Sequence, residues 1–85
     1  MTYSYKTRGT CSRQINFEIA DDGETIQSVE FIGGCNGNLK GISALVKGKK
    51  IDEVIDTLSG IDCNFRGTSC PDQLARALRE YKQSF

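Results

Sequence analysis

The stretch Gln14-Ile15-Asn16-Phe17-Glu18-Ile19, followed by Ala20-Asp21-Asp22-Gly23, decides the fold. In the first part, apolar and polar side chains alternate at every position, a period of two that predicts a β-strand with one buried face. The Asp-Asp-Gly turn indicates a hairpin, because glycine adopts positive φ at little cost. We therefore expect the next apolar stretch, about residues 25–32, to return as an antiparallel strand.

The apolar alternation changes phase inside this third strand. Val29 and Phe31 share one face, whereas Ile26 falls on the other. Either a β-bulge near residues 27–28 or burial on both faces explains the change. Upstream, a weaker alternation over residues 3–8 predicts one more strand, which would precede the two strands of the hairpin.

Beyond the third strand the apolar spacing becomes helical. Three stripes predict helices: Leu39, Ile42, Leu45 and Val46; Ile51, Val54, Ile55 and Leu58; and Leu74, Leu78, Tyr81 and Phe85. Gly48 and the Ser59-Gly60 pair predict the ends of the first two helices, and Pro71 is expected to be the first residue of the third. Strands followed by helices predict an α+β fold, with a three-stranded antiparallel sheet and three helices packed on one of its faces.

The length and composition of the chain exclude several classes of function. A chain of 85 residues predicts a single domain, 1–85, with a thin core. Lys+Arg and Asp+Glu number 11 each, so there is no basic surplus for nucleic acid. The chain has no histidine, which excludes Ser-His-Asp catalysis and histidine-ligated metals. The start of the chain is polar and no long apolar run follows, so we expect a cytoplasmic protein without a signal peptide or membrane segment.

The four cysteines are the informative feature. Cys11, Cys35, Cys63 and Cys70 all fall at boundaries between expected elements, where side chains from different elements converge. Cys35 and Cys70 stand at helix starts, where backbone N–H groups and the helix dipole stabilise the thiolate that binds metal. In a reducing compartment this indicates a Zn or Fe–S site made by all four, with thiol redox chemistry or unligated thiols as alternatives.

A glycine-rich loop surrounds Cys35 and allows a second interpretation. Its other members are Gly33, Gly34, Asn36, Gly37 and Asn38. The glycines would let the backbone approach a group bound at the cysteine. A glycine-rich turn before a helix also suits an anion or a nucleotide phosphate, although the lysine of a phosphate-binding P-loop is missing. A tight turn that simply needs glycine is the third possibility.

The run Thr68-Ser69-Cys70-Pro71-Asp72 is similar to the motif that names the TSCPD domain family. Four further segments resemble those of small stand-alone members: Gly9-Thr10-Cys11-Ser12, the glycine-rich loop, Leu45-Val46-Lys47-Gly48 and Gly60-Ile61-Asp62-Cys63. The likeness covers nearly the whole chain and includes all four cysteines. Within the motif, Ser69 and Asp72 have the spacing of a helix capping box, which with Thr68 and Pro71 would fix the helix start and aim Cys70 at the site.

This resemblance implies a link to ribonucleotide reductases, some of which carry a TSCPD domain near their C-terminus. A complete reductase needs a large barrel, so we expect at most an accessory module that contacts the reductase, another redox protein or a nucleotide. A weaker similarity to iron–sulfur scaffold proteins of the IscU/SufE type favours metal or sulfur chemistry. The leading hypothesis is a cysteine-rich module that binds a metal ion or Fe–S cluster, in electron or sulfur transfer. The alternatives are a metal-free reductase-related module and a thiol redox protein.

Overall fold

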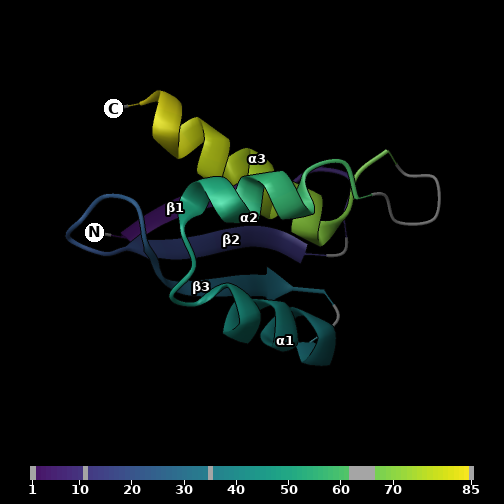
Figure 1. Cartoon of the computed structure of the whole chain (residues 1–85). Helices are drawn as coiled ribbons and strands as arrows, with labels where there is room; N and C mark the ends of the chain where they lie inside the picture. The colour runs from purple at the N-terminus through teal and green to yellow at the C-terminus, as the bar shows by residue number, and fades with distance from the viewer. Residues whose placement is uncertain (1, 11, 35, 62–66, 85) are drawn as a thin grey trace.

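Three strands precede three helices, as the sequence predicts (Figure 1). The computed structural model describes residues 2–10, 12–34, 36–61 and 67–84. The elements are β1 (Thr2–Lys6), β2 (Ser12–Ile19), β3 (Ile26–Gly33), α1 (Asn36–Val46), α2 (Ile51–Leu58) and α3 (Cys70–Gln83). The strands form one antiparallel sheet in the order β1-β2-β3. The α+β class is confirmed.

Central strand β2 separates a buried face of the sheet from a polar one. Ile15, Phe17 and Ile19 are buried under the helices, as their alternation predicts. On the opposite face Asn16 lies between Ser4 of β1 and Glu30 of β3. The Asn16 side chain accepts a 2.8 Å hydrogen bond from Ser4 and lies 3.5 Å from the Glu30 carboxylate. The helices therefore cover the apolar face, while the other face carries a polar row.

A β-bulge explains the change of phase in β3. Glu18 pairs with Ser28 and Ile19 pairs with Ile26, so Gln27 is the extra residue. The bulge returns Ile26 to the core, where it is fully buried. A second irregularity, at Arg13, lies at the other end of the β2–β3 pair. Of the two explanations offered by the sequence, the bulge is correct.

The helices meet the sheet in two groups. Helix α1 packs along β3, while α2 and α3 pack on each other and α3 reaches β2 (Figure 1). Leu74 and Leu78 of α3 are fully buried in the shared core. Within the described ranges, no helix combines the length and the apolar character needed to cross a bilayer.

Three details differ from the sequence-based expectations. Leu45 is 75% exposed. Successive residues of a helix are rotated by about 100° around its axis, which places Leu45 away from the face of α1 that buries Leu39 and Val46. Strand β1 ends at Lys6, after which the chain turns. Helix α3 begins at Cys70, so Pro71 occupies the second position of its first turn, where a missing N–H costs nothing.

Candidate functional site at the start of α3

The first turn of α3 lies at the end of the sheet where β2 begins and β3 ends. Ser12, the first residue of β2, pairs with Gly33, the last residue of β3. Cys70, the first residue of α3, places its sulfur 3.1 Å from Ser12 Oγ. Three segments that are far apart in the sequence therefore meet at one place.

Ser69 caps α3. Its backbone is extended, and its hydroxyl oxygen accepts a 3.1 Å hydrogen bond from the backbone N–H of Asp72. Its carbonyl oxygen accepts from the backbone N–H of Gln73 at 2.8 Å. This half of the expected capping box is confirmed, and it satisfies one of the unpaired N–H groups at a helix start.

The carboxylate of Asp72 is directed to other partners. Oδ2 accepts from the Thr68 hydroxyl at 2.6 Å, and Oδ1 accepts from the backbone N–H of Gly60 at 2.7 Å. Arg76 approaches Oδ2 with Nε at 2.9 Å. Asp72 itself is only 4% exposed. One buried carboxylate thus ties the end of α2, the segment before α3 and the first turns of α3 together.

These partners keep Asp72 ionised. Burial raises the pKa of Asp72, but hydrogen bonds from Thr68 and Gly60 and the positive charge of Arg76 outweigh it, so the pKa lies below its ordinary value of 3.8. Arg76 is half exposed, so solvent screens its share. The carboxylate is therefore a charged acceptor near neutral pH.

Gln73 connects the motif to the loop between β1 and β2. Its side chain is 1% exposed. Nε2 donates to the Thr68 hydroxyl oxygen at 2.9 Å, and Oε1 accepts from the backbone N–H of Arg8 at 3.1 Å. Gly9, with φ +73°, sits against Thr68 so closely that a Cβ there would lie 3.3 Å from the threonine methyl carbon. The β1–β2 loop is thereby held against the start of α3.

Cys70 and the hydroxyl groups of Ser12 and Thr10 form a small polar cluster where this loop meets the start of α3. The half-buried Cys70 is a free thiol. Ser12 Oγ lies 3.1 Å from its sulfur and 3.3 Å from Thr10 Oγ1. Thr10 also donates to the Ser12 carbonyl oxygen at 3.1 Å, and Thr7 donates to the same oxygen. The sulfur therefore faces a hydroxyl group that can serve as donor or acceptor.

The other predicted ligands, Cys11, Cys35 and Cys63, lie outside the described residues. Among the residues that are described, no group of three or more His, Cys, Asp or Glu side chains is arranged to hold a metal ion. The prediction of a four-cysteine site is neither confirmed nor contradicted by this observation, because it concerns only one of the four. It stays a prediction.

The glycine-rich loop connects the end of β3 to the start of α1, as expected. Gly33 and Gly34 have φ of +82° and +86°, a conformation that side chains with a Cβ rarely adopt. Asn36, Gly37 and Asn38 then form the first turn of α1. The backbone of the turn therefore requires Gly33 and Gly34, whether or not the loop binds a ligand.

Comparison with known proteins identifies the family of this domain. The model of the TSCPD domain matches residues 1–82 of the 85-residue chain. The chain belongs to the TSCPD family. No curated protein and no solved structure matches it. In this TSCPD domain, three members of the naming motif, Thr68, Ser69 and Asp72, are the buried residues that fix the start of α3.

Sequence reasoning missed several residues of the TSCPD site. Gln73 directly follows the motif, but a glutamine on a helix gives no sign that it is buried. Gly60 stands out in the sequence as a helix end and as part of a segment shared with the family, but not as a partner of Asp72. Ser12 lies beside Cys11 in a segment shared with the family, and that adjacency was the one available signal.

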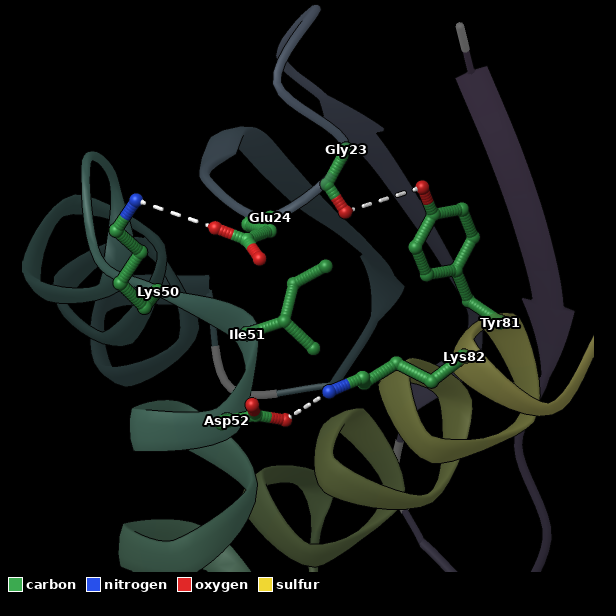
Figure 2. A pocket seen from close by; sticks show the side chains of 7 residues that line it. All are labelled: Gly23, Glu24, Lys50, Ile51, Asp52, Tyr81 and Lys82. Carbon is green, nitrogen blue, oxygen red and sulfur yellow. Dashed lines mark hydrogen bonds and ion pairs between the residues drawn. The ribbon is translucent and has the colours of Figure 1, made fainter. Parts of the chain in front are cut away.

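The TSCPD domain also has a pocket at the opposite end of the sheet (Figure 2). It encloses about 490 Å³ and is lined by Gly23, Glu24, Lys50, Ile51, Asp52, Tyr81 and Lys82. Lys50 lies 3.7 Å from Glu24, and Lys82 pairs with Asp52. Positive and negative groups thus neutralise each other there. The pocket offers no charge preference for a ligand.

Proposed function

We propose that this TSCPD domain uses Cys11, Cys35, Cys63 and Cys70 to bind either a metal ion such as Zn or an Fe–S cluster. The observation that carries the proposal is the meeting of Ser12, Gly33 and Cys70 at one end of the sheet. Ser12 directly follows Cys11 in the sequence, and Gly33 precedes Cys35 by two positions. The chain neighbours of two predicted ligands therefore lie beside the third.

The fourth cysteine follows a segment that is anchored at the same place. Cys63 comes three positions after Gly60 in the sequence. The backbone N–H of Gly60 is bound to Asp72, two residues after Cys70. The buried Asp72 carboxylate thus gives the segment that carries Cys63 a fixed starting point near the first turn of α3.

The surroundings of Cys70 suit a thiolate ligand. The cysteine stands at the N-terminus of a 14-residue helix, where the dipole favours negative charge. Its neighbour is a hydroxyl group, and the carboxylate of Asp72 is already occupied by its own donors. Four thiolates would hold Zn in a closed structural site or anchor an Fe–S cluster for electron or sulfur transfer.

Anaerobic purification followed by metal and sulfide analysis and absorption spectroscopy tests the proposal. Bound Zn or Fe, lost in each of the four single Cys→Ser variants, is the expected result. Asp52→Ala, a change at an exposed carboxylate of α2, is the control and should retain the metal. Four reactive thiols with no bound metal would contradict the proposal and favour a metal-free module. A disulfide that reversibly takes up two electrons would instead favour a thiol redox protein.

A further inference from the structure

Ser12 has an unusual position beside the proposed ligand Cys70. It is 3% exposed, and among the described residues its Oγ lies near two groups, the Cys70 sulfur at 3.1 Å and Thr10 Oγ1 at 3.3 Å. A serine hydroxyl has one proton to donate and can accept others. Which of these two contacts uses that proton depends on the neighbours.

The proton of Thr10 is committed elsewhere. Thr10 Oγ1 lies 3.1 Å from the Ser12 carbonyl oxygen, which can only accept. The contact between the two hydroxyl groups then requires the Ser12 proton. A protonated Cys70 thiol can complete the chain by donating to Ser12 Oγ. In the thiol state the three groups therefore form one directed series, from Cys70 through Ser12 and Thr10 to the Ser12 carbonyl.

If Cys70 binds metal as a thiolate, the hydrogen bond between its sulfur and Ser12 Oγ must reverse its direction. Such a sulfur carries no proton, so it can only accept. Its contact with Ser12 persists if the hydroxyl turns from Thr10 and donates to the sulfur, and a charged acceptor forms the stronger bond. Thr10 keeps its own bond to the Ser12 carbonyl oxygen. The reorientation therefore strands no buried hydroxyl.

We infer that Ser12 is a positioning residue of the proposed metal site, whose hydroxyl donates to the Cys70 sulfur when that sulfur binds metal. The inference rests on the proposed function. A donor of this kind orients the ligand and draws electron density from the sulfur, and loss of such partners typically weakens metal affinity 10–100-fold. In an Fe–S site, hydrogen bonds to sulfur also set the reduction potential.

Titration of anaerobic apo protein with Co²⁺, and competition with Zn²⁺, tests the inference. Ser12→Ala should bind Co²⁺ about tenfold more weakly than the wild type. Its sulfur-to-cobalt charge-transfer absorption should move to lower energy, because the sulfur lone pair loses its donor. Ser12→Thr, which restores a hydroxyl, should recover both properties. Thr10→Val is the matched control, since it removes a hydroxyl of the same loop but leaves the Ser12 donor.

The possible outcomes distinguish failure of the inference about Ser12 from failure of the proposed function. Wild-type affinity and absorption in Ser12→Ala would overturn the inference while leaving the proposed function intact. An equal loss in Thr10→Val would assign the effect to packing of the loop and would also overturn it. A wild-type protein that binds neither metal would refute the proposed function and the inference with it. Ser12→Gly removes the same donor with a different volume and replaces Ser12→Ala if circular dichroism shows that variant unfolded.

Discussion

The backbone N–H of Gly60 donates a 2.7 Å hydrogen bond to the buried carboxylate of Asp72. Gly60 follows α2 with φ +82°, and Asp72 belongs to the first turn of α3. Thr68 and Arg76 bind the other oxygen of the carboxylate. Asp72, the last residue of the naming motif, thus has a structural role, because its carboxylate joins the end of α2 to the start of α3.

Asp72→Ala should therefore destabilise the fold strongly. The change removes the carboxylate that Thr68, Gly60 and Arg76 bind, and it leaves the Thr68 hydroxyl and the Gly60 N–H without that acceptor. We expect the free energy of unfolding to fall by about 3 kcal/mol. The urea midpoint measures this. Asp52→Ala is the control, because it removes an exposed first-turn carboxylate and should cost less than about 0.5 kcal/mol. Equal costs for the two variants would contradict the structural role of Asp72.

Asp72 should also contribute to acid sensitivity. Its pKa is lower in the folded protein than the ordinary 3.8, because donors from Thr68 and Gly60 and the charge of Arg76 outweigh burial. The unfolded chain then takes up the proton first as pH falls. The stabilisation is complete above pH 3.8 and is lost progressively below it. The stability difference between wild type and Asp72→Asn, followed by urea unfolding, should shrink in that range. A difference that does not change with pH would refute the linkage.

Gly9→Ala tests the contact between the β1–β2 loop and the motif. Gly9 and Gly23 have nearly the same φ, +73° and +72°, so alanine should cost about 1–2 kcal/mol of backbone strain at either position. At Gly9 the new Cβ also lies 3.3 Å from the methyl carbon of Thr68, whereas at Gly23 nothing lies within 4 Å. We expect Gly9→Ala to cost at least about 1 kcal/mol more in thermal or urea unfolding. Equal costs would mean that the loop moves aside freely.

Pro71→Ala and Leu78→Ala should separate the site from the core. Pro71 is half buried in the first turn, and its replacement should cost roughly 1 kcal/mol of stability while weakening metal binding at Cys70. Leu78 is fully buried, and its truncation should cost about 2–5 kcal/mol with little change in metal affinity per folded molecule. Metal titration and urea midpoints of both variants provide the comparison. Unfolding of Pro71→Ala with unchanged affinity would show that the proline serves structure alone.

The sheet could be predicted from the sequence because the period of two in β2 is strong and one face is wholly apolar. The phase change of Ile26 relative to Val29 is visible in the sequence and has two possible explanations there; the register of β2 and β3 identifies the bulge at Gln27 as the correct one. Leu45 was misplaced because a stripe of four apolar residues is wider than the face that α1 actually buries. An apolar residue at the edge of such a stripe has no local feature that distinguishes it from a core residue.

The candidate site was predictable in its helix start but not in its long-range partners. Ser69 and the proline mark the start of α3 through local chemistry that needs no other element. One partner of Asp72 is a backbone group 12 positions earlier, and one partner of Gln73 lies on the β1–β2 loop. Such pairs depend on how the helices pack on the sheet, which periodicity alone does not specify. The convergence of the four cysteines stays a prediction.

The bond between Arg8 and Gln73 has a consequence for how the protein is made. It joins residues 65 positions apart, so the ribosome must add nearly the whole chain before the first loop can find its partner. Contacts this distant in sequence form late, because a long loop must close first. Until α3 is made, the apolar face of the β1–β2 hairpin lacks the buried leucines that pack in the same core. Transient exposure of this surface makes the unfinished chain prone to aggregate.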